Sequence, residues 1–352
     1  SNRTWRFWPI RSIAPQRFLD ALARGTPLYD EATLNGYVEQ DLHLLDEVQP
    51  DLVVGDFRLS LAVSAPLRGA RYASVTNAYW SPYARREYPL PEIPIARIVG
   101  VSLATAVFRL LRPAIFSHHA RPMNRLRRRY GLQPLGDLTH VYTSADHTLY
   151  ADIPGLVPTF ERPANHQYIG PIFWSPEVER PGWWDRLGTD RRVVYVTLGS
   201  SGSVDLLPMV ARALRRLPVD VMVATAGRIS LKELPEGAWA ADYLPGTEAA
   251  RRASLVVCNG GSPTSYQALG QGVPVLAIAS NMDQHLMARQ VAAAGAGLLL
   301  RAGHATERSV HDAAAMILDQ GSFRLRAAEI AREMAQYRAS ARFGSLVHQW
   351  LG

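Results

Sequence analysis

The sequence predicts an α/β protein in two parts, each built on a parallel sheet that is covered by helices. The chain has 352 residues, 47% of them hydrophobic, which is too long for one small core and too apolar for a disordered chain. In its second half, short apolar strands alternate with helical segments, as in a parallel sheet covered on both faces. The first half repeats this pattern less regularly, beginning with an amphipathic helix over residues 37–48.

The second half is expected to contain six strand and helix units. We predict strands at 193–198, 219–225, 239–243, 255–258, 273–278 and 297–300, and helices at 205–216, 247–252, 263–270 and 284–294. Gly270, Gly272 and Gly295 stand where helices should end. Two further helices are expected at 323–337 and 342–351.

The first half offers four strand candidates, at 51–56, 71–76, 148–153 and 168–172. Four strands are few for a doubly wound domain, and the sequence begins with Ser-Asn-Arg. We therefore expect an incomplete N-terminal domain, preceded by about two more strand and helix units.

A domain boundary is predicted where periodicity is lost. Residues 171–192 are rich in Pro, Gly and Trp, which is typical of a linker. The predicted division is a first domain at 1–172, a linker at 173–191 and a second domain at 192–337. The last helix, within 338–352, is expected to pack back on the first domain.

Composition excludes several classes of protein. The formal charge of +7 comes almost entirely from arginine, since Lys232 is the only lysine, so it argues only weakly for nucleic-acid binding. Cys258 is the only cysteine, which excludes an intrachain disulfide and a thiolate zinc site, and points to the cytoplasm. The longest apolar run, 98–111, is shorter than the roughly 20 residues of a membrane-spanning helix.

Two glycine loops follow the first and fourth predicted strands of the second domain. These are Gly199-Ser200-Ser201-Gly202 and Asn259-Gly260-Gly261-Ser262-Pro263-Thr264. In a sheet of order 3-2-1-4-5-6, the carboxyl ends of those two strands meet where ligands bind. Glycine lets backbone N–H groups approach an anion, and a helix starting near Pro263 would direct its positive end there. One such loop is often a plain turn, but two at this position indicate a diphosphate site.

Residues 192–300 resemble the UDP-glycosyltransferase family, which includes bacterial natural-product enzymes. The likeness is carried by the loop Asn259–Thr264, by Gly272-Val273-Pro274 and by Asp283-Gln284, in the family's order and spacing. The resemblance implies the GT-B fold, in which two Rossmann-like domains face each other across a cleft. It also implies that residues 1–172 bind the acceptor and 192–337 bind a nucleotide sugar.

Donor-binding roles follow from this resemblance, position by position. Backbone and hydroxyl groups at the two loops would bind the diphosphate: Gly199, Ser200, Asn259, Gly260, Gly261, Ser262 and Thr264. Gln267 would face the ribose, while Asp283 and Gln284 would hold the sugar hydroxyls. Tyr243 would lie against the base, with Leu244 offering its backbone, although Tyr243 is equally consistent with a core aromatic. Asp283 also fits a helix N-cap.

Three residues depart from the family pattern. Asn259 replaces a histidine, Pro263 a glycine and Gln267 an acidic residue. Asparagine can donate a hydrogen bond but carries no charge, so the departing diphosphate would depend more on backbone N–H groups.

The resemblance makes Asp56 the partner of a catalytic histidine. That histidine would remove the acceptor hydroxyl proton while Asp56 orients its imidazole. The family carries the histidine after its first N-terminal strand, and none of the ten histidines here has that context. Asp56 could instead cap the next helix. His118 and His119 fit a surface or core position better than a catalytic one.

No metal or other cofactor is expected, because no two aspartates are separated by one residue as in the metal-dependent sugar transferases. The acceptor would contact the loop at 76–83, with Asn77, Tyr79 and Trp80, whose aromatic character suggests an apolar molecule. The stretch 93–129 combines apolar helical turns with arginines. It could contact an anionic membrane at its periphery, cover the acceptor pocket, or be a solvated face.

The predicted function is transfer of a sugar from a UDP- or dTDP-sugar to a hydroxyl of a small, lipophilic acceptor, with inversion and without metal. The alternatives are a GT-B-fold epimerase or lipid-intermediate transferase, and a non-catalytic nucleotide-sugar-binding protein.

Overall fold

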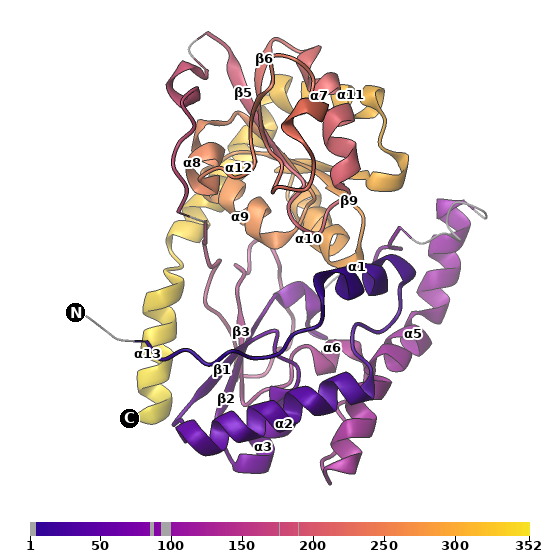
Figure 1. The fold of residues 1–352 in the computed structure, drawn as a ribbon, viewed down its shortest axis with the longest axis vertical. Coiled ribbons are helices and arrows are strands. Elements are labelled where there is room, and N and C mark those ends of the chain that lie inside the picture. Colours follow the sequence, from indigo (N-terminus) through magenta and orange to yellow (C-terminus); the bar gives the residue numbers. More distant parts are fainter. Residues whose placement is uncertain (1–4, 85–87, 93–99, 176, 189) are drawn as a thin grey trace.

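The computed structural model describes residues 5–84, 88–92, 100–175, 177–188 and 190–352. Residues 93–99 of the predicted arginine-rich stretch, and residues 176 and 189 of the predicted linker, lie outside the described residues. Two parallel sheets form the framework, one in each half of the chain, and Figure 1 shows them as a lower and an upper layer.

The first sheet has the strand order β1-β2-β3-β4 and is parallel throughout. Its strands are β1 (Val53–Asp56), β2 (Tyr72–Thr76), β3 (His147–Tyr150) and β4 (His166–Tyr168), shorter than predicted at β3 and shifted toward the N-terminus at β4. The helices of this half are α1 (Pro15–Arg24), α2 (Glu31–Val48), α3 (Leu61–Arg68), α5 (Val101–Arg129) and α6 (Leu138–Val141).

The second sheet has the order β10-β9-β8-β5-β6-β7, which is the predicted 3-2-1-4-5-6 arrangement. Its strands are β5 (Arg192–Thr197), β6 (Val219–Ala224), β7 (Trp239–Ala241), β8 (Leu255–Cys258), β9 (Val275–Ala279) and β10 (Gly297–Arg301). Its helices are α7 (Leu207–Arg215), α8 (Gly246–Arg252), α9 (Ser262–Gly270), α10 (Met282–Ala293), α11 (Glu307–Asp319) and α12 (Gly321–Ala335).

Alternation along β5 shows how both faces of this sheet are buried. Val194 and Val196 pack with α7 and α11, whereas Val193 and Tyr195 pack with α8, α9, α10 and α12. Successive side chains of a strand point to opposite faces, so a wholly apolar strand fits only a sheet covered twice. Helix α11 was not predicted from the sequence, although Thr306 caps it in a capping box and Val310, Ala313, Ala314 and Ile317 follow a helical period.

The last helix, α13 (Ala339–Leu351), leaves the second half and lies along the first sheet (Figure 1). Its residues Phe343, Leu346 and Trp350 pack on a cluster that contains Leu149 of β3 and Ile169. The Trp350 ring stacks on that of His147 at 3.8 Å between centroids. The chain therefore crosses twice between the two halves.

The segment predicted as a linker is packed rather than free. Within its described residues it forms one short 3₁₀ turn, Trp184–Arg186. Trp184 and Leu187 are buried in the same core as the second sheet. Aromatic burial, which composition alone does not indicate, explains this order.

Candidate functional site

The two glycine loops lie side by side, because β5 and β8 are hydrogen-bonded neighbours. A Cβ atom on Gly199 would lie 3.2 Å from Nδ2 of Asn259, and one on Gly202 would lie 2.9 Å from the Asn259 Cβ. Gly199 and Gly260 have φ values of 60° and 79°, in the left-handed region that favours glycine. A Cβ on Gly260 would also approach the Cβ atoms of Ala277 and Ala288 to 3.0 Å. The backbone of the second loop is thus pressed against β9 and α10.

Helix α9 begins directly behind this loop, with Gly261 as its N-cap and Pro263 in its first turn. The Asn259 side chain is buried, and its Oδ1 accepts a hydrogen bond from the Gly261 N–H at 3.0 Å. Asn259 thereby shapes the loop instead of extending from it. Ser200 is exposed, while Ser262 and Thr264 are partly exposed at the start of α9. The free N–H groups of a helix start favour an anion here.

Asp283 and Gln284 lie in the first turn of α10, but they face different surroundings. Asp283 Oδ1 accepts a hydrogen bond from the Trp80 indole N–H at 2.8 Å, and burial raises the pKa of Asp283. Gln284 is almost fully buried, and its Oε1 accepts from the Ser280 N–H and hydroxyl, each at 2.9 Å. Its amide donates to the backbone oxygen and to Oγ of Ser201, both at 3.3 Å. Gln284 therefore ties α10 to the first glycine loop.

The residues assigned to the base and the ribose occupy contrasting positions. Tyr243 lies beyond the end of β7, is 55% exposed, and donates its hydroxyl to the Ala226 carbonyl at 3.2 Å. It is therefore not a core aromatic. Leu244 is buried, so only its backbone is a candidate for contact. Gln267 is nearly buried on α9 and donates its amide N–H to the Trp174 carbonyl at 2.6 Å.

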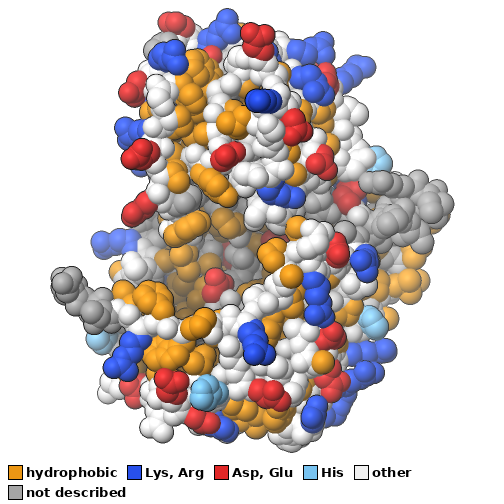
Figure 2. Space-filling model, viewed as in Figure 1, with side chains coloured by type: hydrophobic (Ala, Val, Ile, Leu, Met, Phe, Trp, Pro, Cys, Tyr) orange, Lys and Arg blue, Asp and Glu red, His pale blue; other side chains and the backbone are white. Residues whose placement is uncertain are grey.

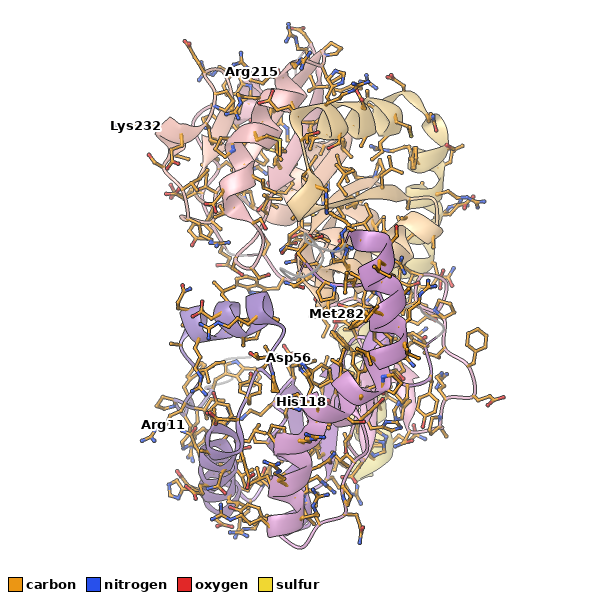
Figure 3. The ribbon with its side chains drawn as sticks, turned by 90° about the vertical axis from the view of Figure 1, so that its right-hand side faces the viewer. Arg11, Asp56, His118, Arg215, Lys232 and Met282 are labelled. Carbon is orange, nitrogen blue, oxygen red and sulfur yellow. The ribbon has the colours of Figure 1, made fainter. Side chains whose placement is uncertain are left out.

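Asp56 is the last residue of β1. It lies at the carboxyl ends of the strands of the first sheet, on the side that faces the second half. The Asp56 residue as a whole is exposed, but its carboxyl group is partly buried, and this burial raises its pKa. The next residue, Phe57, has a φ of 52° and borders a cavity between the two halves. The positions of Asp56 and His118 can be followed in Figure 3.

The cavity has a volume of about 890 Å³ and a mainly apolar lining. Its apolar walls come from the first half, with Phe18 and Leu22 of α1, Phe57, and Phe108, Leu111 and Ile115 of α5. At its boundary with the second half lie Ser201, Asn281, Met282 and Asp283. Figure 2 shows the surface hollowed between the two halves. Met282 of α10 and His118 of α5, both labelled in Figure 3, belong to the cavity lining.

Of the three residues assigned to the acceptor, Asn77 and Trp80 line this cavity. Tyr79 does not belong to its lining and is completely buried. In the short 3₁₀ turn Ala78–Trp80, successive side chains point in different directions. The three residues assigned together to the acceptor therefore do not all reach the cavity.

A buried polar contact joins the two halves beneath the glycine loops. Asp152, which follows β3, accepts hydrogen bonds from the Tyr266 hydroxyl of α9, from the Ala78 N–H, and from Asn77 Nδ2 at 3.1 Å. Burial raises the Asp152 pKa to about 6 despite these donors. Neither Asp152 nor Tyr266 was singled out by the sequence, since a lone aspartate after a strand and a tyrosine on a helix carry no signal of pairing.

Helix α1 and the cavity position of two histidines were also not predicted from the sequence. Pro15 at the helix start, Gly25 at its end, and Phe18 with Leu22 one turn apart were available signals for α1. His118 and His119 border the cavity, and burial lowers the pKa of His119. The sequence left open whether the stretch 93–129 covers the acceptor pocket, but it gave no sign that these two histidines lie there.

Two further findings concern metals and membranes. Among the described residues, no group of three or more His, Cys, Asp or Glu side chains comes together as a metal ion would require. No helix in the described part of the chain is long and apolar enough to cross a membrane.

Known proteins share this sequence pattern over most of the chain. Residues 200–341 match the family described as erythromycin biosynthesis protein CIII-like, C-terminal domain. A PGL/p-HBAD biosynthesis rhamnosyltransferase of Mycobacterium bovis (strain BCG / Pasteur 1173P2) is 50% identical over 328 residues, covering 93% of this chain and 73% of the relative. A PGL/p-HBAD biosynthesis glycosyltransferase of Mycobacterium tuberculosis (strain ATCC 25177 / H37Ra) is 50% identical over 324 residues, covering 92% and 76%.

Among solved structures, spinosyn rhamnosyltransferase SpnG in complex with thymidine diphosphate is similar in fold. The TM-score is 0.66 at 19% identity, covering 95% of this chain and 80% of SpnG. This likeness confirms the predicted GT-B architecture. Since half of its residues are identical to the mycobacterial enzymes over more than nine-tenths of its length, the chain belongs to the family 1 glycosyltransferases of the macrolide type and is itself a glycosyltransferase.

Proposed function

We propose that this glycosyltransferase moves a sugar from a UDP- or dTDP-sugar to a hydroxyl group of a lipophilic acceptor, with inversion at the anomeric carbon and without a metal ion. The observation that carries the proposal is the position of Asp283. It borders the apolar cavity and lies on α10, against which the second glycine loop is pressed. Donor and acceptor would therefore meet at the start of α10.

The diphosphate would be held by the backbone N–H groups of Ser262 and Thr264 at the start of α9, with Ser200, Ser262 and Thr264 adding hydroxyl groups. Gly199, Gly260 and Gly261 would shape the two loops, since their N–H groups already donate to Thr197 Oγ1, Cys258 Sγ and Asn259 Oδ1. The start of α9 supports this because it directs N–H groups toward the loop, and the positive φ values of Gly199 and Gly260 keep the loops free of Cβ atoms there. Fixed dipoles of this kind stabilise a leaving diphosphate where no metal does. Asn259 contributes by fixing the loop shape.

The nucleoside would lie toward β7. The exposed Tyr243 ring offers a stacking surface for a pyrimidine, and the Leu244 backbone adjoins it. Gln267 donates its amide to Trp174, so its Oε1 is the atom that would accept from a ribose hydroxyl. SpnG was solved with thymidine diphosphate, which supports a pyrimidine diphosphate in this fold.

The sugar would contact Asp283, while Gln284 acts by positioning. Gln284 is almost fully buried, and its amide already serves α10 and Ser201. We therefore assign to it the placing of the first glycine loop instead of a direct hydrogen bond to the sugar.

The acceptor would occupy the cavity with its hydroxyl near Asn77 and Trp80. Its remaining atoms would contact Phe18, Phe57 and Phe108, which suit an apolar molecule. Asp56 would orient a histidine base, which the family carries after its first N-terminal strand. In domain terms, residues 1–172 would bind acceptor and 192–337 donor, joined by 173–191, with 338–352 returning to the first domain.

A thermal-shift screen tests donor and site together. UDP, dTDP and GDP sugars are each added to the purified protein and to the variants Asp283→Asn and Asp319→Asn. One pyrimidine class should raise the Tm, and Asp283→Asn should reduce that shift by weakening the contact with the sugar. Asp319→Asn, at an exposed carboxylate paired with Arg192, should leave it unchanged.

The acceptor half of the proposal has a separate test. Ala21→Phe places a ring in the cavity from α1, so it should raise the acceptor KM about tenfold or more while the nucleotide-sugar shift persists. A GDP-specific shift, or equal shifts in wild type and Asp283→Asn, would contradict the donor assignment. Unchanged acceptor KM in Ala21→Phe would contradict the acceptor site.

A further inference from the structure

Helix α5 exposes an unusual number of large apolar side chains. Leu103 is 58% exposed, Val107 47%, Leu110 81% and Leu111 48%. Their spacing of four, three and one residues places them on one side of the helix. A contiguous exposed apolar stripe of this kind marks an interaction surface more often than chance exposure.

The same side of the helix becomes basic toward its C-terminus. Arg121, Arg125, Arg128 and Arg129 are exposed and follow Leu103 at intervals close to whole turns. Residues 101–129 contain no aspartate or glutamate. We call these four apolar residues and four arginines the α5 face. The α5 face is positively charged, and α5 contributes no acidic residue to it. Figure 2 shows hydrophobic side chains with basic ones below them along the right-hand flank, where Figure 1 places α5.

This face is continuous with the cavity. Leu111 belongs to the face and also lines the cavity, together with Ala114 and His118 one and two turns further on. Behind them Phe108, Ile115 and His119 form the cavity wall. Leu111 thus connects the apolar side chains of the α5 face directly to the apolar lining of the cavity.

We propose that the α5 face is a docking surface for a bilayer rich in anionic phospholipid. Leu103, Val107 and Leu110 would enter the boundary between headgroups and acyl chains, and the arginines would contact lipid phosphates. Two copies of this chain joined through the same face would bring rows of arginines together, which disfavours a second copy as the occupant. Entry of the acceptor from the bilayer rests on the proposed function, whereas docking itself does not.

Flotation with lipid vesicles tests the docking. The purified protein is mixed with vesicles of phosphatidylcholine alone or of phosphatidylcholine with phosphatidylglycerol, at low and at high salt. We expect binding only to the anionic vesicles, weakened by salt because the attraction is screened. Leu110→Asp, and the triple variant Arg121→Gln/Arg125→Gln/Arg129→Gln, should each reduce the partition coefficient about tenfold or more.

Matched controls lie in the second half of the chain. Leu325→Asp changes an exposed leucine of α12, and Arg216→Gln/Arg308→Gln/Arg338→Gln removes the same charge from exposed arginines away from α5. Both should bind vesicles like wild type, and all variants should keep the wild-type Tm and nucleotide-sugar shift.

Absence of vesicle binding, or binding that survives both α5 variants, would overturn the proposal. Binding lost in the arginine variant but kept in Leu110→Asp would also overturn it, since the apolar stripe would then play no part. A dimer in solution that Leu110→Asp dissociates, without vesicle binding, would assign the face to a protein partner instead. A protein that binds vesicles but shows no donor shift would contradict the proposed function and leave the docking intact.

Discussion

Gly260 shows how a single residue fixes the geometry of the second glycine loop, where we propose the diphosphate binds. Its φ is in the left-handed region, and a Cβ there would meet Ala277 and Ala288 at once. A side chain at Gly260 would therefore strain the backbone and would also push against β9 and α10.

Gly260→Ala should lower the free energy of unfolding by about 2–3 kcal/mol through backbone strain and overpacking. Donor affinity should fall with it, because the loop backbone must shift. Gly36→Ala is the matched control: Gly36 lies within α2 with nothing within 4 Å of a new Cβ, so this change should stabilise by about 0.5–1 kcal/mol. Denaturant unfolding measures both, and equal effects would contradict the packing argument.

The buried Asp152 carboxyl makes the stability of the protein depend on pH. Burial raises its pKa to about 6, and the nearby Asp283 carboxyl acts in the same direction. The folded state therefore holds a proton that the unfolded chain has already released. Stability from this group is complete below the unfolded pKa near 3.8 and is lost as the pH rises through about 6.

Asp152→Asn should remove this pH dependence. The unfolding free energy at pH 4, taken relative to that at pH 7, should fall by about 2–3 kcal/mol in the variant. A tenfold difference in proton affinity between the folded and unfolded states corresponds to about 1.4 kcal/mol. Asp312→Asn serves as a control at an exposed carboxylate. Urea unfolding at a series of pH values gives the comparison, and an unaltered profile in Asp152→Asn would show that Asp152 is not the group that titrates.

At the scale of elements, the start of α10 joins the sheet, the first glycine loop and the cavity. Asn281 and Gln284 form a reciprocal capping box, and the Gln284 amide continues to Ser201. Helix α11 has an equivalent capping box in Thr306 and Ser309, which is exposed and away from both glycine loops.

The two caps make a matched pair of tests. Gln284→Ala should cost about 1–3 kcal/mol of stability and weaken nucleotide-sugar binding, because it removes a buried cap and the link to Ser201. Ser309→Ala should cost about 1 kcal/mol or less and leave donor affinity unchanged. Calorimetric titration with the nucleotide sugar compares the two variants. Equal donor affinities in Gln284→Ala and Ser309→Ala would contradict a positioning role for Gln284.

At the scale of the molecule, residues 88–92 tie the first half to the second. The Glu92 N–H donates to the Ser280 carbonyl at 3.1 Å, and its carboxylate pairs with Arg301 Nε at 2.8 Å. Arg301 also donates to the carbonyls of Leu90 and Pro91. Although burial opposes it, the His285 imidazole, 3.6 Å from the carboxylate, and the Arg301 charge hold the pKa of Glu92 below its usual value. Because Pro91 lines the cavity, this contact sets one cavity wall.

Arg301→Gln should therefore raise the acceptor KM about tenfold while leaving nucleotide affinity unchanged, and lower stability by about 2–4 kcal/mol by leaving Glu92 uncompensated. The exposed pair Arg308–Asp312 provides the control, and Arg308→Gln should change stability by less than about 1 kcal/mol. Steady-state kinetics with both substrates distinguishes the effects. A proportional loss of donor and acceptor binding would mean that the contact acts on folding alone.

Local signals in the sequence predict the strands of the second sheet and the position of its two glycine loops. Apolar strands such as Leu255–Cys258 and glycines at their ends are local signals, so both can be predicted, whereas the strand order came from the doubly wound pattern. Which of the matched residues lie at the cavity and which are buried could be known only from the fold. Gln284 and Tyr79 turned inward, whereas α1, His118 and His119 came to the cavity, because burial and contacts between the two halves depend on packing across distant segments.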